Sequence, residues 1–167
     1  SDYLYRLVTN PWKTITAGLD SLLYPQLCLA CERTLDTAQG HFICAGCSAS
    51  LPFTQHHELI ENELTDRLAG RTRLVFGGAL FYYQPESAVQ RMIHALKYYH
   101  RPDIALKLGE FYGKRLKNIE RLKDLNAIIP VPLHPQRQLE RGYNQAERIG
   151  AGIAKCLDLP QFAHGLK

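Results

Sequence analysis

The sequence predicts an α/β domain with a parallel sheet, preceded by a small module built around four cysteines. Two apolar runs, residues 74–83 and 127–131, are rich in the β-branched and aromatic residues typical of strands. Segments between and after these runs have apolar residues at helical spacing. The resulting order, β–α–α–β–α, is typical of helices packed on a parallel sheet. Because only two or three strands are visible, the sheet is expected to be partial.

Composition and length divide the chain into four parts. We assign residues 1–24 to an N-terminal amphipathic helix, 25–53 to the cysteine module, 54–73 to a connecting segment and 74–167 to the incomplete α/β domain. A length of 167 residues fits one core domain with a small appendage. With 46% hydrophobic and 22% charged residues the chain has a globular composition, and its net charge of +4 does not by itself indicate a nucleic-acid partner.

The N-terminal part carries one amphipathic stripe, formed by Trp12, Ile15, Leu19 and Leu22. This stripe either packs on its own domain or docks on a partner or a membrane. No apolar run approaches the roughly 20 residues of a membrane span. The sequence also lacks a basic-then-apolar leader pattern, so we expect a cytoplasmic protein with reduced cysteines.

The central part is expected to pass from a polar connection into a strand and two helices. In the connection, one helical turn is expected around residues 59–68, and His56 and His57 are expected in solvated loops. The strand-like run 74–83 includes a Gly77–Gly78 kink or bulge. Pro85 then opens one helix, and Asp103 can cap the next. The predicted buried faces are Val89, Met92, Ile93 and Leu96 in the first helix, and Ile104, Leu108, Phe111 and Tyr112 in the second.

The last helix, from Asn144 to Cys156, has the clearest pattern. Asn144 followed three residues later by Glu147 resembles a capping box. The buried stripe is predicted to consist of Ala146, Ile149, Gly150, Ile153 and Leu157. Cys156 stands alone on this helix and is expected to be a small core residue.

The four cysteines of the module form two CxxC pairs separated by twelve residues, Cys28 with Cys31 and Cys44 with Cys47. Each pair can present two thiolates from one tight turn, so two pairs can close a tetrahedral site for Zn²⁺. The alternatives are disulfides, which a cytoplasmic chain disfavours, and a single redox CxxC, which the paired spacing disfavours. Four thiolates leave no open coordination position, so a structural metal is expected, with His41 as a replacement ligand that the site does not need.

The stretch 128–147 combines a strand, a cationic loop and a helix start. The loop holds Arg137, Arg141 and Gly142, and the helix is expected to begin at Asn144. Arginine makes bidentate bonds to phosphate, and a helix N-terminus adds N–H donors and a favourable dipole. This arrangement predicts a phosphate site, the alternative being a solvated basic loop.

A second basic cluster, formed by Lys97, His100 and Arg101, lies beside Tyr98 and Tyr99. It is either a solvated helix end or a surface for single-stranded nucleic acid, which combines phosphate contacts with base stacking.

Three segments of the chain resemble one known family. They are YPQLCLACERTL with FICAGC, MIHALKYYHRPDIALKLGEF, and IIPVPLHPQRQLERGYNQAE, which together extend from about residue 24 to 159. They are similar to the ComF/GntX-type family of phosphoribosyltransferase-like proteins, which is linked to DNA uptake in bacterial competence. The resemblance implies a type I phosphoribosyltransferase-like sheet with helices, behind a small zinc-ribbon-like module whose metal is held by four cysteines.

The resemblance also implies ligands and partners. Phosphoribosyl pyrophosphate or a related phosphate would be the ligand, accompanied by Mg²⁺, and single-stranded DNA and a competence helicase would be partners. Nucleic-acid or phosphate contacts would come from Lys97, Tyr98 and Arg101. The pyrophosphate loop would consist of Arg137, Arg141, Gly142, Tyr143, Asn144 and Gln145.

The acidic ribose-phosphate motif of the family, of the type Asp-Asp-Val-x-Thr-Thr-Gly, does not occur in this sequence. We therefore expect either a fragment of a longer protein or a site that cannot be completed, and no catalytic residue is assigned. The expected function is a competence-related ligand-binding protein. The alternatives are an active phosphoribosyltransferase of nucleotide metabolism and a non-catalytic, zinc-stapled interaction module.

Overall fold

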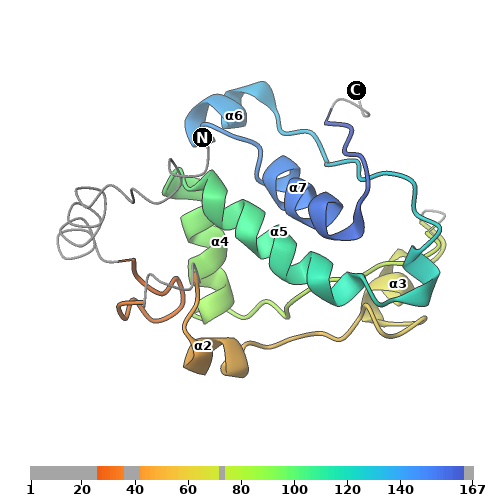
Figure 1. Cartoon of the computed structure of the whole chain (residues 1–167), viewed down its shortest axis with the longest axis horizontal. Helices are drawn as coiled ribbons and strands as arrows, with labels where there is room; N and C mark the ends of the chain where they lie inside the picture. Colours follow the sequence, from red (N-terminus) through yellow and green to blue (C-terminus); the bar gives the residue numbers. More distant parts are fainter. Residues whose placement is uncertain (1–25, 36–41, 72–73, 164–167) are drawn as a thin grey trace, which may run out of the picture.

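The computed structural model describes residues 26–35, 42–71 and 74–163, which form short helices joined by irregular segments (Figure 1). The predicted N-terminal helix lies outside these ranges. No helix within them has the length and hydropathy that a membrane crossing requires. The elements are α2 (Ala45–Ser50), α3 (Glu63–Leu68), α4 (Ala88–Tyr98), α5 (Pro102–Leu116), the 3-10 helix η2 (Glu120–Leu122), α6 (Pro135–Arg141) and α7 (Gln145–Leu157).

The predicted parallel sheet is wrong, because the described residues contain no strand and only three isolated bridges. The run expected as a strand at 127–131 makes a single parallel bridge, in which Ile128 N–H donates to Pro160 O and Phe162 N–H donates to Ile128 O. Pro130 and Pro132 follow, and proline has no N–H with which to extend a ladder.

The run at 74–83 does not form a strand either, because it finds a backbone partner at only one bridge. Its one bridge joins Phe81 to Phe53, and Tyr82 N–H donates to Pro52 O. These contacts hold it against an irregular segment that makes no further bridge, so no ladder forms within the described ranges.

Helix α4 forms where the sequence predicts a helix, but it begins at Ala88, three residues after the predicted start at Pro85. Ser87 is its N-cap and accepts a hydrogen bond from Gln90 N–H. Of the predicted face, Val89, Met92 and Leu96 are buried, whereas Ile93 is only partly buried.

Helix α5 begins differently from the prediction, because Pro102 occupies its first turn and Asp103 pairs with Arg101 instead of capping the helix. Its buried face is also shifted toward small residues. The buried residues are Ile104, Ala105, Gly109, Gly113 and Leu116, whereas the predicted Leu108, Phe111 and Tyr112 are partly exposed.

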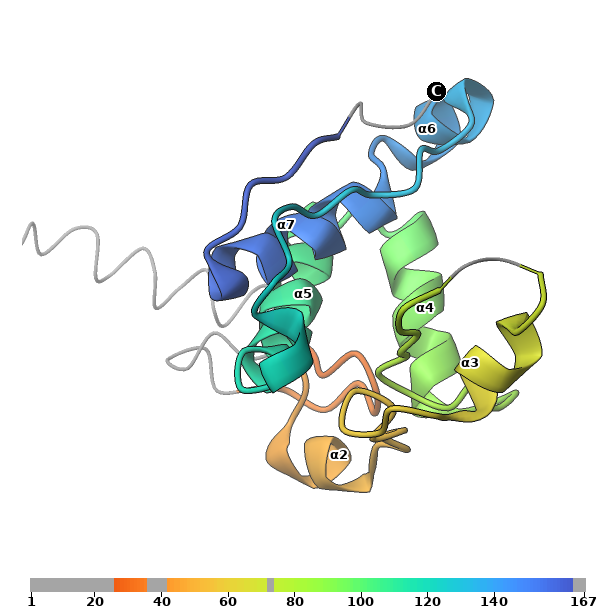
Figure 2. The same cartoon turned by 90° about the vertical axis from the view of Figure 1, so that its right-hand side faces the viewer.

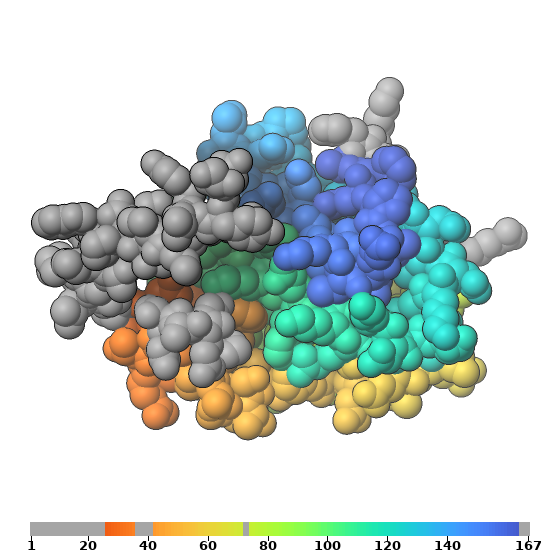
Figure 3. Space-filling model, viewed as in Figure 1, coloured from red at the N-terminus to blue at the C-terminus, as the bar shows by residue number. Residues whose placement is uncertain are grey.

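The most extensive helix–helix contact joins α5 to α7, which lie side by side in both cartoon views (Figures 1 and 2). In the space-filling view the side chains of the two helices meet along one seam (Figure 3). The helices approach so closely that a Cβ added at Gly109 would lie 2.1 Å from Ile149 O. Helix α7 starts as predicted, with Asn144 as N-cap; its side chain accepts from Ala146 N–H.

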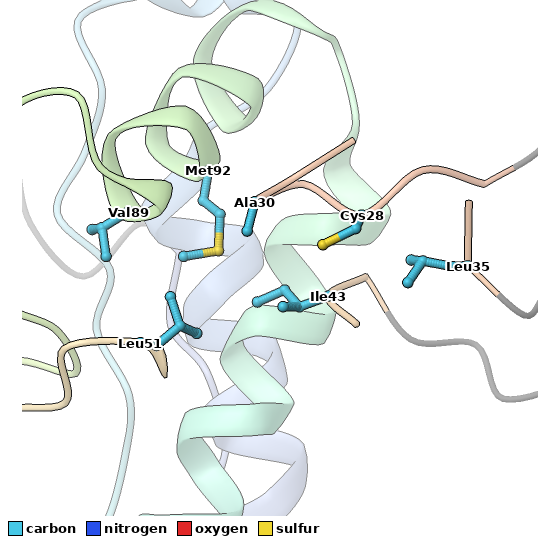
Figure 4. Packing of buried hydrophobic residues seen from close by; sticks show 7 residues of the cluster. All are labelled: Cys28, Ala30, Leu35, Ile43, Leu51, Val89 and Met92. Atoms are coloured by element: carbon cyan, nitrogen blue, oxygen red, sulfur yellow. The ribbon is translucent and has the colours of Figure 1, made fainter. Parts of the chain in front are cut away.

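Two apolar clusters meet at α4. The first joins the cysteine module to Val89 and Met92 of α4 (Figure 4), and the second joins Leu96 to Ile104 and Ala105 of α5. Leu29 and Phe42, from the module, pack against both clusters. The module therefore shares its core with the helices.

The connecting segment contradicts the prediction that its histidines are solvated. His56 is 6% exposed and His57 is 5% exposed. Arg121 Nη2 donates to the backbone carbonyls of His57 and Leu59, the latter at 2.8 Å. These bonds connect the segment to η2, which follows α5 in the chain. The His57 ring meets the Tyr112 ring edge to face at a centroid distance of 5.8 Å.

Candidate metal centre and phosphate-binding surface

The four cysteines of the two CxxC pairs come together, as their spacing predicts. Their sulfur atoms all lie within 4.8 Å of one another, and Cys31 Sγ lies 3.8 Å from Cys44 Sγ. Metal–sulfur bonds of about 2.3 Å in a tetrahedron place the sulfurs roughly 3.8 Å apart. The cluster can therefore hold one metal ion.

Local backbone structure aims the thiols at one point. Residues 26–35 form a tight turn in which Cys28 N–H donates to Arg33 O at 2.8 Å and Glu32 N–H donates to Cys28 O at 2.8 Å. The second pair sits at the start of α2, where Cys44 is the N-cap and its sulfur accepts from Cys47 N–H at 3.4 Å. Cys44 N–H in turn donates to Cys28 Sγ at 3.3 Å, which links the two pairs.

The thiols of the cluster differ in pKa. Backbone hydrogen bonding from Arg33 is the main cause that lowers the pKa of Cys31 to about 6. Hydrogen bonds with Cys31 and Cys44 raise the pKa of Cys47 to about 12, because a second thiolate beside the first is unfavourable. A cation bound between them would remove this conflict, so the thiol set fits a metal such as zinc.

The predicted cationic loop is a helix in its central part. Residues 135–141 form α6, with Pro135 at its start and Gly142 as its C-cap. Gly142 adopts a left-handed φ of 74°, which glycine tolerates without strain. Arg137 is exposed and Arg141 is half-buried, with its guanidinium donating to Gln145 Oε1 at 3.1 Å.

The structure brings this segment onto the second basic cluster. His100 Nδ1 lies 3.0 Å from Arg141 O, and a Cβ on Gly142 would lie 3.2 Å from the same nitrogen. Tyr143 Oη donates to Leu96 O at 2.6 Å, at the end of α4. Two clusters that lie about forty residues apart in the sequence are thus tied together where His100 meets the backbone of Arg141, and we call their cationic residues the basic surface (Lys97, His100, Arg101, Arg137 and Arg141).

The remaining predicted loop residues support this junction. Burial is the main cause that raises the pKa of Tyr143, so its hydroxyl stays protonated and can donate. Asn144 is buried, and its amide donates to Val131 O at 3.1 Å. Gln145 Nε2 donates to Tyr143 O at 3.3 Å. Tyr143 and Asn144 therefore act as structural ties here, because each already has a protein partner.

The aromatic residues beside the second cluster are exposed. Tyr98 is 58% exposed and Tyr99 is 62% exposed. The His94 ring lies 4.5 Å from the Tyr98 ring and 6.0 Å from the Tyr99 ring, centroid to centroid. Arg101 is held by two hydrogen bonds to Asp103, at 2.9 and 2.8 Å. Of the predicted contacts, Lys97 and Tyr98 lie in the last turn of α4, and Arg101 follows as the N-cap of α5.

Sequence reasoning missed a pocket of about 890 Å³ between the cysteine module, the length of α4 and the start of α5. Its lining includes the apolar residues Leu29, Phe42, Ala95 and Ile104 together with Tyr99, Arg101 and Lys107. No sequence pattern indicates it, because the lining comes from segments up to about 80 residues apart that meet only in the fold.

Comparison with curated proteins finds an informative relative. The chain is 28% identical over 142 residues to competence protein F of Haemophilus influenzae, which covers 84% of this chain and 58% of that protein. The match confirms the resemblance to the ComF-type family, and the chain spans somewhat more than half the length of this relative. No protein-family profile matches the chain. No solved structure matches it either.

Proposed function

We propose that this chain, as a relative of competence protein F, serves DNA uptake in natural competence by binding phosphate-rich ligands on its basic surface. Phosphoribosyl pyrophosphate or a related phosphate, with Mg²⁺, would bind near Arg137 and Arg141. Single-stranded DNA would pass along Lys97, Tyr98 and Arg101. One observation supports this proposal above the others: His100 Nδ1 lies 3.0 Å from the backbone oxygen of Arg141, so one residue of each basic cluster meets the other.

The chemistry of the basic surface suits such ligands. Arg137 is exposed, and Lys97 is only partly buried, so both cations can reach a ligand. Exposed tyrosines beside cations are typical of single-strand binding, because phosphates meet the cations while bases stack on the rings. A bound phosphate or DNA strand would relieve the repulsion between neighbouring cations and would accept charge-assisted hydrogen bonds from them.

The metal of the cysteine cluster is proposed to be zinc in a structural role. Four sulfur donors match its tetrahedral preference, and a site filled by four protein ligands keeps no position for a substrate. The ion would be held by Cys28, Cys31, Cys44 and Cys47 and would supply folding free energy.

Binding of a labelled single-stranded oligonucleotide, followed by fluorescence anisotropy over a range of salt concentrations, tests the function. Removing both Arg137 and Arg141 by substitution with alanine should weaken binding of inorganic pyrophosphate with Mg²⁺, measured by calorimetry, by about tenfold or more. Removing Lys97 and Arg101 should reduce the salt slope of oligonucleotide binding by about 1.4, the value for two phosphate contacts.

The double variant Arg67→Ala/Arg71→Ala is the matched control, because it removes two exposed arginines around α3 and changes the net charge equally. It should leave both affinities unchanged. If the control weakens binding as much as the other variants, the binding reflects net charge alone and the basic surface is not the site.

A further inference from the structure

We propose that His100 is a positioning residue of the basic surface, which holds the segment 141–143 in place through its Nδ1 atom and does not itself touch the ligand. This inference rests on the proposed function, since it says how the two basic clusters keep their relative positions before a phosphate-rich ligand arrives. His100 lies in the corner between α4 and α5, and its side chain is exposed.

The backbone of this corner is unusual at His100. Its φ of 49° lies in the left-handed region, which residues other than glycine seldom adopt. Such a conformation persists only when surrounding contacts hold it, and it occurs preferentially at ligand clamps and similar sites. The contact that His100 makes here is with the 141–143 segment, where its Nδ1 lies 3.0 Å from the carbonyl oxygen of Arg141.

The chemistry of that contact fixes the state of the imidazole. A carbonyl oxygen only accepts hydrogen bonds, so Nδ1 must carry a proton and donate it to Arg141 O. Gly142 packs against the same nitrogen, since a Cβ added there would lie 3.2 Å from it. Nδ1 of His100 is therefore engaged by the protein and offers no donor to a ligand.

Tyr143 makes a reciprocal tie from the segment back to the corner. Its hydroxyl donates to Leu96 O at 2.6 Å and lies 3.4 Å from Arg101 O. Leu96 is in the last turn of α4, where helix carbonyls lack N–H partners within the helix. The corner and the segment thus each send one side chain to the backbone of the other.

These two ties act on arginines whose side chains are already held. Arg141 donates to Gln145 Oε1 at 3.1 Å, and Arg101 donates to both carboxylate oxygens of Asp103. With the side chains held and the backbones tied together, the two guanidinium groups are placed before a ligand binds. Preorganisation of this kind raises affinity, because less freedom is lost on binding.

Hydrogen exchange without any ligand tests the tie itself. The probe is the Gly142 amide, which donates to Gln138 O at 2.8 Å at the end of α6. His100→Gly keeps the left-handed backbone but removes the donor, so it should speed exchange at this amide about fivefold. His100→Asn should leave exchange within about twofold, because asparagine tolerates this backbone and its amide nitrogen is as many bonds from Cα as Nδ1 is.

Binding then tests the positioning role, at pH 8, where an imidazole is ordinarily neutral and its replacement changes no formal charge. His100→Gly should weaken binding of a labelled single-stranded oligonucleotide and of pyrophosphate with Mg²⁺ by about fivefold, and His100→Asn should restore both to within about twofold. His100→Gln, whose amide nitrogen reaches the place of Nε2, should restore neither. Rescue by glutamine instead of asparagine would assign His100 to direct ligand contact and overturn the proposal.

A double-mutant cycle supplies a readout that a merely structural residue would not move. Arg101→Ala and Arg141→Ala keep the backbone oxygens of the ties, and their effects on oligonucleotide affinity should be coupled in the intact chain but additive in His100→Gly. Gln55→Gly is the matched control, at another exposed residue with a left-handed φ, and should change neither affinity nor coupling.

The outcomes separate this inference from the proposed function. Unchanged affinities in His100→Gly, or additive arginine effects in the intact chain, overturn the positioning role and leave the proposed function standing. Binding of neither ligand by the intact chain overturns the proposed function, and the positioning role with it. The exchange rate at Gly142 decides independently of any ligand whether the tie holds the segment.

Discussion

At the scale of single residues, His57 is buried without adequate polar compensation. Its Nδ1 has no hydrogen-bond partner among the described residues, and its Nε2 lies 3.8 Å from Glu58 Oε1. Burial is the main cause that lowers its pKa below 6.5, and the positive charges of Arg115 and Arg121 lower it further against the opposing effect of Glu58.

The folded state therefore binds a proton at His57 less readily than the unfolded state. Where the folded pKa lies below the unfolded value, stability is complete above the unfolded pKa and is lost as the pH falls toward the folded pKa. We expect the free energy of unfolding by urea to decrease from pH 7.5 toward pH 5, on a window that begins near 6.5.

His57→Phe should flatten this decrease, because it removes the proton-binding difference while keeping an aromatic ring against Tyr112. His94→Gln, at an exposed position, controls for the removal of an imidazole. An unchanged pH slope in the His57 variant would refute the assignment.

At the scale of elements, the α5–α7 contact depends on the absence of side-chain atoms at Gly109. A Cβ there would lie 2.1 Å from Ile149 O and 2.9 Å from Ile149 C, both of them backbone atoms that a rotamer change cannot move. Gly109→Ala should destabilise the protein by about 1–3 kcal/mol despite the better helix propensity of alanine. Thermal or urea unfolding measures the difference.

Gly46→Ala in α2 is the matched control, because an added Cβ there meets no atom within 4 Å. It should be neutral or stabilise by up to about 1 kcal/mol. Equal destabilisation by the two substitutions would show that backbone freedom, and not the close helix contact, determines the cost.

The elements also differ in how well the sequence predicts them, according to whether their signals are local. Helices α4 and α7 carry their own signals, a cap residue and an apolar stripe, within about a dozen residues, although of the stripe predicted for α7 only Gly150 is buried. The predicted strands do not, since a strand exists only when a partner extends its ladder, and Ile128 finds one bridge before Pro130. The burial of His57 is equally non-local, because it depends on Arg121.

The two candidate sites also differ in whether local sequence predicts them. The candidate metal centre is predictable from cysteine spacing, because each CxxC pair presents its two sulfurs from one tight turn. Its four ligands are Cys28, Cys31, Cys44 and Cys47. The contact between His100 and Arg141 spans 41 residues and depends on how α4, α5 and α6 meet, which no local pattern encodes.

At the scale of the whole molecule, the metal centre should contribute much of the stability. Removing the ion with a chelator, or replacing Cys28 by serine, should lower the midpoint of thermal unfolding by more than about 10 °C. Metal analysis should find one zinc per chain before treatment. Cys156→Ser is the control, because this thiol lies on α7, outside the cluster, and donates only to Glu110 O. An unchanged midpoint after metal loss would contradict the structural role.

Helix α4 has a consequence for how the chain unfolds. Val89 and Met92 belong to the core of the cysteine module, and Leu96, one turn later on the same helix, belongs to the core formed with α5. One rigid element thus enters two hydrophobic cores, so neither can melt while the other keeps its packing. Calorimetry should accordingly record a single cooperative transition, with the calorimetric enthalpy equal to the van't Hoff enthalpy, in place of separate steps for module and helices.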